Sequence, residues 1–457
     1  MYSINFRIAL SLIILVCLAQ FGYAQVTTTT VNDELANYLE YVYSQKAFSG
    51  EILIAFNNEI QFHEAIGLAS RELDVPMRKG SKFKIASISK TFTGALIALA
   101  KQAGKLSARD LVSTHLPDLS PQFKDITILQ LLQHTSGLPH NEAIPNYWQE
   151  KSRLALNTEA VIAEINRLEL LFSPGEQMKY SSLGYFLLAT VLEKVYDKPY
   201  QEILYENIYK RLDMRSSGSA NSLKIVQGIS SGYHMMPNDS VVVAPYRNYS
   251  MLKGAGDQIS TAEDLLKWNN SFIKNKIFDD YEQEEILNKK TLSKPYGYGW
   301  YTDYKSEKQK YYHGGGTWGF SSYNAFYPAS GLSIIILSNL STLPVNAIAD
   351  QIEKILSGEK LSLISKTQEV QAPSFSLDTY TGVYTSASGQ MKLSVISQKG
   401  QLFAQLQGNP PFIITSMGEH KFLGKKIDIE LDFKTNDDLV IGIIAKRMGR
   451  KFEFKKQ

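Results

Sequence analysis

The sequence predicts an α+β protein with a small all-β module at its carboxyl end. Apolar, strand-like runs lie at both ends of residues 30–357, helical periodicity fills the middle of that stretch, and short alternating runs follow residue 374. Strands at both ends of one segment indicate an antiparallel sheet flanked by helices, with an all-helical insertion. We expect the functional site to lie between the sheet and the insertion.

Residues 1–24 have the pattern of a secretory signal. Arg7 is the only charge before an apolar run at residues 8–18, and Ala24 offers a small residue at a cleavage point. The run is too short to span a bilayer comfortably, so we expect no stable membrane insertion after the signal is removed. The mature protein is therefore predicted to be periplasmic or secreted.

Cysteine usage and charge exclude several classes of protein. Cys17 is the only cysteine and lies inside the predicted signal, so the mature chain would have no disulfide and no thiol nucleophile. Lipidation of Cys17 is disfavoured because Val16 stands where lipoprotein signals have a small residue. A net charge of +3 argues against nucleic acid or anionic membrane as the main partner. The histidines show no metal-ligand spacing, so we expect neither a metal nor a cofactor.

The elements follow in a simple order along residues 30–357. A helix is expected first, then a hairpin with an Asn57-Asn58 turn, then a long helical region, and finally two strands and a closing helix. The expected ranges are 33–47 for the first helix, 51–56 and 60–66 for the hairpin, 87–275 for the helical region, 322–327 and 332–337 for the late strands, and 343–356 for the closing helix.

The composition changes after Gly358. A polar segment with weak periodicity follows and is interpreted as a linker, and beyond it apolar residues alternate in three short runs, residues 391–395, 402–406 and 427–433. The predicted divisions are a signal at 1–24, a main domain at 25–358, a linker at 359–373 and a β-rich domain at 374–457.

Ser-x-x-Lys spacing occurs five times, and only context separates the matches, which begin at Ser81, Ser87, Ser250, Ser271 and Ser357. Ser87 lies just before an apolar run, residues 92–100, that predicts a buried helix. A serine in the first turn of such a helix has its hydroxyl at the positive end of the dipole, and Lys90 lies over the same face. Burial favours neutral lysine, which could accept the serine proton. On spacing alone, an N-cap serine and a surface lysine are the simpler interpretation.

Two further features could belong to the same site. Tyr180 lies at a junction between a turn and an apolar helix, where it could act as a proton shuttle beside a lysine, although 26 tyrosines make a core position common. The run His313-Gly314-Gly315-Gly316 precedes a predicted strand, and glycines there let backbone N–H groups approach a ligand, as an oxyanion hole requires. A phosphate loop is excluded because no Lys-Ser or Lys-Thr pair and no helix follow the glycines.

Together these motifs resemble class C-type serine β-lactamases and their relatives, the D-Ala-D-Ala carboxypeptidases, D-aminopeptidases and β-lactamase-like esterases. The matching stretches are residues 87–93, 131–139, 180–185, 254–256, 260–264, 296–300 and 313–315, in family order. The resemblance covers about residues 30–357 and implies a β-lactamase/transpeptidase-like fold. The β-rich tail is similar to the lipocalin-like module that often follows this domain.

The resemblance implies a role for each residue of the site. Ser87 would be the acylated nucleophile, with Lys90 and Tyr180 sharing the general-base work. The N–H groups of Ser87 and Gly316 would form the oxyanion hole. The substrate-binding residues would be Ser182, His313, Gly315 and Gly316. His134 lies in a stretch that the family uses structurally.

Two residues depart from the family pattern. Ser182 stands where the second motif commonly has Asn, and a serine cannot make the same two-sided contact with an acylamide side chain. His313 replaces the Lys of many β-lactamases, so the site loses a permanent positive charge. Both departures argue against efficient hydrolysis of penicillins and are compatible with esterase or peptidase relatives.

The resulting hypothesis is an exported serine hydrolase that works through an acyl-enzyme. Its substrate would be an ester or amide of a small or peptidoglycan-derived molecule, as for an esterase, a D-Ala-D-Ala carboxypeptidase or a D-aminopeptidase. One alternative is a class C-type β-lactamase, which would turn over nitrocefin rapidly. The other is a non-catalytic, penicillin-binding-like scaffold, which would neither react with active-site probes nor hydrolyse esters.

Overall fold

The computed structural model describes residues 28–44, 48–359 and 375–457 with short gaps. The gaps are 221–224, 237–239, 275–276, 289–295, 304–308, 342–344, 387–388, 390, 399, 408–410, 425–428, 438 and 448–449. The predicted signal at 1–24 lies outside the described residues, as do residues 360–373 of the predicted linker. No described helix has the length and apolar character needed to cross a membrane.

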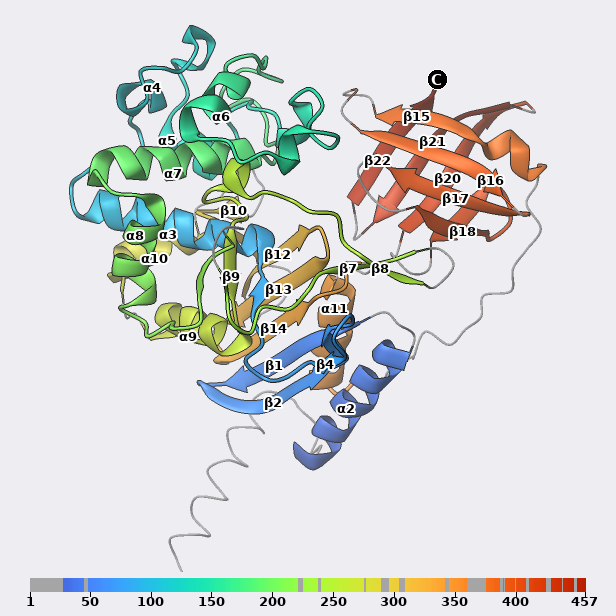
Figure 1. The fold of residues 1–457 in the computed structure, drawn as a ribbon, viewed down its shortest axis with the longest axis horizontal. Coiled ribbons are helices and arrows are strands. Elements are labelled where there is room, and N and C mark those ends of the chain that lie inside the picture. Colours follow the sequence, from blue (N-terminus) through green and yellow to red (C-terminus); the bar gives the residue numbers. More distant parts are fainter. Residues whose placement is uncertain are drawn as a thin grey trace, which may run out of the picture.

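The centre of the protein is a seven-stranded antiparallel sheet in the order β10-β11-β12-β13-β14-β1-β2 (Figure 1). The strands are β1 Gly50–Phe56, β2 Glu59–Ile66, β10 Tyr296–Gly297, β11 Trp300–Asp303, β12 Lys310–Thr317, β13 Phe320–Tyr327 and β14 Leu332–Ser338. Strand β1 pairs with β14, so strands from the two ends of the domain are neighbours in the sheet. This confirms the predicted α+β class with strands contributed from both ends.

The β1–β2 hairpin turns at the two asparagines predicted for it. Asn57 and Asn58 both have positive φ, 51° and 74°. Two successive left-handed residues match the twist of the flanking strands, and asparagine tolerates this conformation better than most residues. The late strands and the closing helix also lie where they were predicted, as β13, β14 and α11 (Val345–Leu356).

Helices cover both faces of the sheet. Helices α2 (Thr28–Ser44) and α11 pack on one face, because α11 buries a stripe with helical spacing: Val345, Ile348, Ala349, Ile352 and Ile355. The helical region covers the other face (Figure 1). Its helices are α3 Ser89–Gln102, α4 Val112–His115, α5 Ile128–Leu132, α6 Thr158–Ile165, α7 Ser182–Tyr196, α8 Tyr200–Leu204, α9 Ala262–Ile273 and α10 Asp280–Asn288.

Helix α3 forms the centre of this second layer and is buried from residue 89 to residue 100. Gly94 allows the helix to approach the sheet side closely, because a Cβ there would lie 2.1 Å from the carbonyl oxygen of Tyr298. A helix that is apolar on every side is stable only when surrounded by protein. Residues 92–100 therefore lie in the predicted buried helix. The position of this helix holds the residues just before it against the sheet.

Short elements connect these layers. The minor strands are β3 Leu68–Ser70, β4 Val75–Pro76, β5 Phe83–Lys84, β6 Gly218–Ser219, β7 Tyr233–Met235, β8 Val241–Val243 and β9 Gln258–Ser260. The short helical turns are η1 Ala86–Ile88, η2 Pro121–Phe123, η3 Asn141–Ala143, η4 Lys151–Arg153, η5 Tyr205–Tyr209, η6 Ser250–Leu252 and η7 Leu377–Tyr380. Strands β5, β9 and β6 form a small sheet that leads directly into η1.

The carboxyl-terminal residues form a closed eight-stranded barrel. Its strands are β15 Gly382–Ser386, β16 Lys392–Gln398, β17 Gln401–Leu406, β18 Phe412–Ser416, β19 Lys421–Gly424, β20 Ile429–Asn436, β21 Leu439–Arg447 and β22 Arg450–Lys456. The alternating residues Leu393, Val395, Leu402 and Ala404 point into its core, which confirms the predicted all-β module. The barrel has its own apolar core; the exact domain boundaries stay a prediction.

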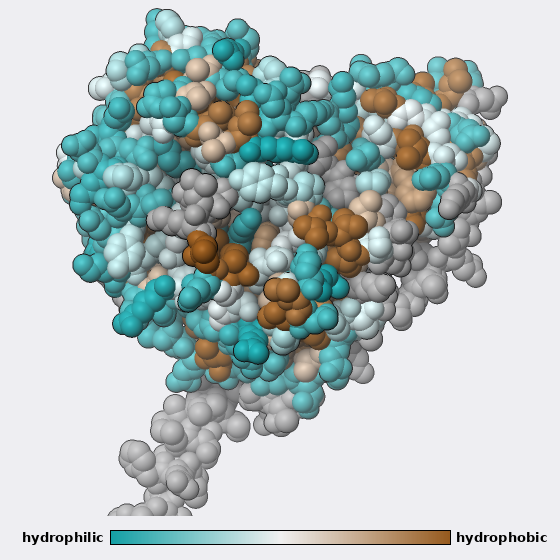
Figure 2. All heavy atoms as spheres, in the orientation of Figure 1, coloured by the Kyte–Doolittle hydropathy of each residue, from teal (hydrophilic) through white to brown (hydrophobic). Residues whose placement is uncertain are grey.

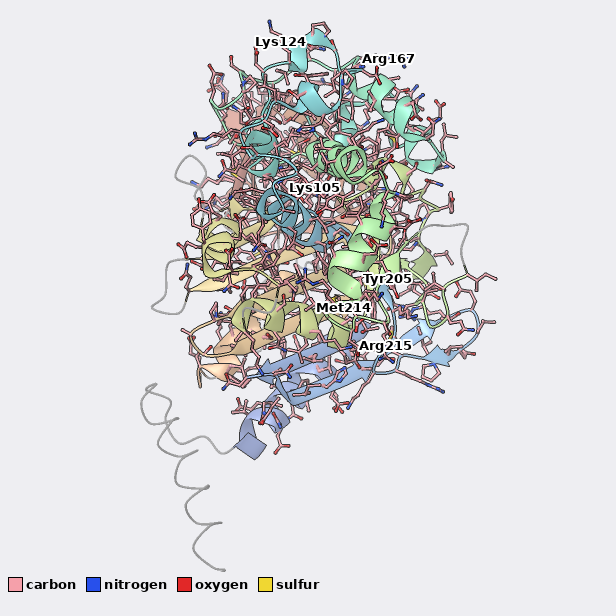
Figure 3. All side chains as sticks on the ribbon, turned by 90° about the vertical axis from the view of Figure 1, so that its left-hand side faces the viewer. Lys105, Lys124, Arg167, Tyr205, Met214 and Arg215 are labelled. Carbon is pink, nitrogen blue, oxygen red and sulfur yellow. The ribbon has the colours of Figure 1, made fainter. Side chains whose placement is uncertain are left out.

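The surface is mixed rather than dominated by one character. The face in Figure 2 is largely hydrophilic, with small separate apolar patches. Seen from the helical side, Lys105, Lys124, Arg167 and Arg215 are spread over the outer surface (Figure 3). All four of these side chains are exposed.

Candidate active site

Ser87 lies at a strained junction between β5 and α3. It is half-buried in the turn η1, and α3 begins two residues later at Ser89. Ser87 therefore precedes the first turn of the helix in which it was predicted, and the chain reaches it through Ala86, whose φ is +47°. A side chain with a Cβ rarely adopts this conformation unless its surroundings impose it.

The strands on either side hold this junction in place. The N–H of Ile85 donates to the carbonyl of Gln258 in β9 at 3.0 Å. The Ser322 hydroxyl, in β13, donates to the carbonyl of Ile85 at 2.8 Å. The Ser87 hydroxyl is thus presented by a backbone that is fixed on two sides.

Lys90 is fully buried, and its Nζ atom lies at the centre of the site. Nζ is 3.3 Å from Ser87 Oγ, 3.2 Å from Ser182 Oγ and 2.6 Å from the carbonyl oxygen of Ala255. No carboxylate among the described residues lies within 4.0 Å of it. Burial holds the pKa of Lys90 well below its usual value, and the charge of Asp257 only partly opposes this. An amine whose charged form is disfavoured by burial, next to a serine hydroxyl, is positioned to act as a general base.

Tyr180 lies beside Lys90 among three imidazole rings. Lys90 Nζ lies over its ring, 4.8 Å from the centroid. The ring centroids of His134, His140 and His313 are 4.3, 5.8 and 6.3 Å from that of Tyr180. The structure therefore brings Tyr180, Lys90 and His313 into one cluster, as the sequence predicted.

Ser182 makes a contact that the sequence did not reveal. Its Oγ, 3.2 Å from Lys90 Nζ, is also 3.0 Å from Nε2 of His140, and Nδ1 of His140 contacts the carboxylate of Glu142. The polar side chains of the site thus form a network of successive contacts, from Glu142 to His140, then to Ser182 and to Lys90. His140 directly follows the matched stretch 131–139, and this proximity was the only signal in the sequence that could have marked it.

His313 lies in strand β12 and is buried. Its Nδ1 is 2.6 Å from the carbonyl oxygen of Gly314, and its Nε2 is 3.4 Å from the hydroxyl of Tyr296. The carbonyl requires a proton on Nδ1, and in the neutral imidazole Nε2 can then accept from the tyrosine hydroxyl. This arrangement is satisfied by the neutral imidazole and places no fixed charge at the position where many β-lactamases have lysine.

The glycines of β12 let the strand lie directly against η1. A Cβ on Gly315 would be 2.3 Å from the carbonyl oxygen of Ile85 and 3.1 Å from the backbone nitrogen of Ser87. A Cβ on Gly316 would meet nothing within 4 Å, so this residue borders open space. The backbone N–H groups of Ser87 and Gly316 therefore belong to adjacent segments beside the serine hydroxyl, as an oxyanion hole requires.

His134 has a structural position under the site. It is buried, with φ of +59°, and its Nδ1 accepts from the N–H of Ser181 at 3.2 Å. Burial is the main reason that the pKa of His134 lies well below its usual value. A neutral acceptor that fixes the start of α7 fits the packing and hydrogen-bonding role expected from the resemblance.

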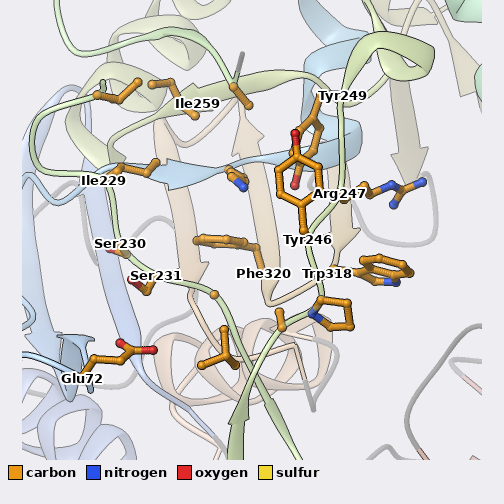
Figure 4. A pocket seen from close by; sticks show the side chains of 17 residues that line it. Glu72, Ile229, Ser230, Ser231, Tyr246, Arg247, Tyr249, Ile259, Trp318 and Phe320 are labelled. Atoms are coloured by element: carbon orange, nitrogen blue, oxygen red, sulfur yellow. The ribbon is translucent and has the colours of Figure 1, made fainter. Parts of the chain in front are cut away.

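A cavity of about 530 Å³ adjoins the end of β12 (Figure 4). Arg247 and Tyr249 form part of its wall, and both contact Thr317, the residue after Gly316. Lys84 also lines it. The sequence did not indicate these residues because they come from distant segments that only the fold brings together.

One group among the described residues has the geometry to hold a metal ion. Donor atoms of Glu51, His63 and Glu263 lie within 4.8 Å of one another, at β1, β2 and the start of α9. Carboxylate and imidazole are typical zinc ligands. In this structure His63 pairs with Glu51, which receives the N–H of Gly80 at 3.1 Å. Among the contacts of the described residues, no hydrogen bond or ion pair joins this group to Ser87 or Lys90.

Comparison with known proteins decides the family. The family model described as Beta-lactamase matches residues 34–357, which is most of the chain. The chain belongs to the β-lactamase family. This confirms the family, and with it the serine hydrolase class, that the motifs predicted.

Two similar proteins span this chain almost completely, and a third covers 72% of it. Penicillin-binding protein 4* of Bacillus subtilis is 25% identical over 443 residues, covering 92% of this chain and 97% of its own. The octameric penicillin-binding protein homologue from Pyrococcus abyssi has a TM-score of 0.66 at 21% identity, covering 93% of this chain and 99% of its own. D-amino acid amidase from Ochrobactrum anthropi has a TM-score of 0.64 at 21% identity, covering 72% and 99%.

Proposed function

We propose that this protein is an exported serine hydrolase that opens ester or amide bonds through an acyl-enzyme on Ser87. The observation that carries the proposal is the buried amine of Lys90, 3.3 Å from the Ser87 hydroxyl and without a carboxylate within 4.0 Å among the described residues. A lysine in that setting has no evident structural task that an apolar residue could not perform, because burying its charge is costly.

The proposed reaction uses the residues in a fixed sequence. Lys90 accepts the Ser87 proton while Oγ attacks the substrate carbonyl carbon, and the N–H groups of Ser87 and Gly316 stabilise the resulting oxyanion. The carbon–leaving group bond then breaks, and Lys90, with Tyr180 as the shuttle, returns the proton to the leaving group. Water attacks the acyl-enzyme by the same route, which releases the acid and restores Ser87.

The proposed substrate class is a small ester or amide, including D-amino-acid and peptidoglycan-derived compounds. Relatives named as penicillin-binding proteins and a neighbour named D-amino acid amidase support this class. The lack of a permanent positive charge on His313 disfavours a substrate whose carboxylate must be bound at that position. Export is proposed from the pattern of residues 1–24, and amino-terminal sequencing of the secreted or periplasmic protein should begin at Gln25.

A fluorophosphonate probe with mass mapping tests the nucleophile. We expect a single adduct on Ser87 in the purified mature protein and none in Ser87→Ala. Ser357→Ala is the matched control, because Ser357 begins another Ser-x-x-Lys match but is exposed and only contacts its own turn. An adduct at another residue, or full labelling of Ser87→Ala, contradicts the proposal.

A substrate panel then separates the alternatives. p-Nitrophenyl esters, D-Ala-D-Ala peptides and D-amino acid amides should be hydrolysed faster than nitrocefin. Rapid nitrocefin turnover would assign a β-lactamase activity instead. An intact protein that is neither labelled nor active on any ester would point to a non-catalytic scaffold.

A further inference from the structure

The cavity next to β12 is lined by aromatic rings and two basic side chains. The rings of Tyr249 and Phe320 face Lys84, whose Nζ lies 4.7 Å and 5.5 Å from their centroids. Figure 4 shows Phe320, Tyr249 and Trp318 around the same space that Arg247 borders. Pockets of this kind bind an apolar body through the rings and fix its orientation through a few charged groups.

Arg247 is a buried cation to which no described residue supplies a counter-ion. The residue is 8% exposed, and no carboxylate among the described residues lies within 4.0 Å of it. Its guanidinium contacts two hydroxyls, Thr317 at 3.3 Å and Tyr147, while Nε, which is also buried, has no hydrogen-bond partner. Aromatic rings of Tyr147, Trp148 and Trp318 surround it. A buried charge is normally paired with an opposite charge, and no described residue supplies that charge to Arg247.

The acidic residues nearby are already engaged. Glu72, on the cavity wall, accepts from the hydroxyls of Tyr233 and Ser70, and the bond from Tyr233 holds the pKa of Glu72 below its usual value. Glu142 is also within the electrostatic reach of Arg247. Burial raises the pKa of Glu142, but its contact with His140 outweighs burial and the net shift is downward. Neither Glu72 nor Glu142 forms an ion pair with Arg247 or Lys84.

The position of the cavity fixes which half of a substrate would reach it. Lys90 and Tyr180, which return the proton to the leaving group, lie on the His313 side of Gly316. Arg247 instead contacts Thr317, on the other side of Gly316 along β12. If the carbonyl oxygen lies between Ser87 and Gly316, the leaving group points toward His313 and the acyl group toward Thr317 and the cavity.

We propose that this cavity binds a carboxylate on the acyl part of the substrate, with Arg247 and Lys84 as its counter-ions. The substrate class is then an ester or amide of a short dicarboxylic or acidic amino acid, with its free carboxylate a few bonds from the scissile carbonyl. The guanidinium supplies a fixed positive charge with directed N–H donors, and Lys84 adds a more solvated charge. The inference rests on the proposed function and narrows its substrate.

Two esters that differ only in charge test the inference. Mono-p-nitrophenyl glutarate carries the free carboxylate, and the p-nitrophenyl ester of monomethyl glutarate is its neutral counterpart. The wild-type protein should have a higher kcat/KM for the anionic ester. Arg247→Gln should lower the ratio of the two kcat/KM values by about tenfold or more, because the charge pair is buried, and Lys84→Gln by about two- to fivefold, because that ammonium is partly exposed.

Lys82→Gln is the matched control, since Lys82 is two residues from Lys84 but does not line the cavity. Its ratio should equal that of the wild type. A wild-type ratio at or below one, or an unchanged ratio in Arg247→Gln and Lys84→Gln, overturns the inference.

A binding measurement separates this inference from the proposed hydrolase activity. Glutarate is titrated calorimetrically into Ser87→Ala, where no turnover can occur. Binding that is lost in the double variants Ser87→Ala/Arg247→Gln and Ser87→Ala/Lys84→Gln supports the cavity, even if the wild-type protein hydrolyses neither ester. Absence of glutarate binding together with turnover of the neutral ester retains the hydrolase and rejects the cavity.

Discussion

Two lysines six residues apart, Lys84 and Lys90, have opposite environments and therefore different chemistry. Lys90 is fully buried beside Ser87, and burial lowers its pKa. Lys84 is half-buried, and its ammonium lies over aromatic rings at the edge of an open cavity. The same side chain is thus suited to accepting a proton in one place and to attracting an anion in the other. Because both residues are lysines, the difference in their solvent access accounts for the difference in their proposed roles.

The largest effect should follow removal of the buried amine. Lys90→Met keeps the length of the side chain but deletes the base, so kcat/KM for the neutral ester should fall by about 10²- to 10⁴-fold. Steady-state kinetics on the p-nitrophenyl esters measure this. Lys82→Met provides the comparison on the neighbouring segment and should remain within twofold of wild type, on the order of a typical surface change. If Lys90→Met retained most of the activity, the proposed difference in role between Lys90 as the base and Lys84 as an anion-binding residue would be wrong.

The next effect concerns the contacts that keep Lys90 in place. His140→Gln retains an amide that can bond to Ser182 but loses the pairing with Glu142. A hydrogen bond to a charged group is worth about 1.5–3 kcal/mol, so kcat should fall by at least about tenfold. Glu142→Gln should produce a similar decrease, and the double variant should add little if the residues act as one chain. Additive losses would show that His140 and Glu142 act separately.

The sequence predicted the parts of the site that depend on local pattern. The Ser87 and Lys90 spacing, the buried run behind it and the glycines after His313 are contiguous, and so are the hairpin at Asn57 and the alternating strands of the barrel. These features follow from periodicity and turn chemistry, which a single segment expresses by itself.

The remaining features required the tertiary fold. Strand β12 was not predicted because His313 and its glycines lack the alternation of a half-buried strand, and only contact with η1 explains them. Arg247 and Lys84 line the same cavity although they come from segments more than a hundred residues apart. A sequence pattern within one segment cannot reveal that two such distant residues lie near each other. The individual catalytic roles stay predictions until the variants are measured.

A smaller effect is expected in the pH profile. Protonated Lys90 cannot accept the Ser87 proton, so kcat/KM should fall as the pH drops through the lowered pKa of Lys90. Asp257 opposes this shift, because its negative charge raises the pKa of Lys90. Its own pKa is raised by burial to about 6, so it is charged above that pH. Asp257→Asn should therefore move the acidic limb to lower pH. A movement to higher pH would contradict this assignment of the charges.

The smallest effect should be the dependence of turnover on ionic strength, and it should involve Lys84 but not Lys90. The Debye length falls from about 10 Å at 0.1 M to about 3 Å at 1 M ionic strength, which screens partly exposed charges and leaves buried ones almost unchanged. Turnover of the anionic ester, which depends on Lys84, should fall by about twofold relative to the neutral ester over that range, on the scale of an exposed ion pair. The neutral ester, which depends on Lys90, should change little. Because Lys84→Gln removes the screened charge, its ratio should become less sensitive to salt than that of the wild type. Equal salt sensitivity in both proteins would mean that Lys84 does not contact the substrate carboxylate.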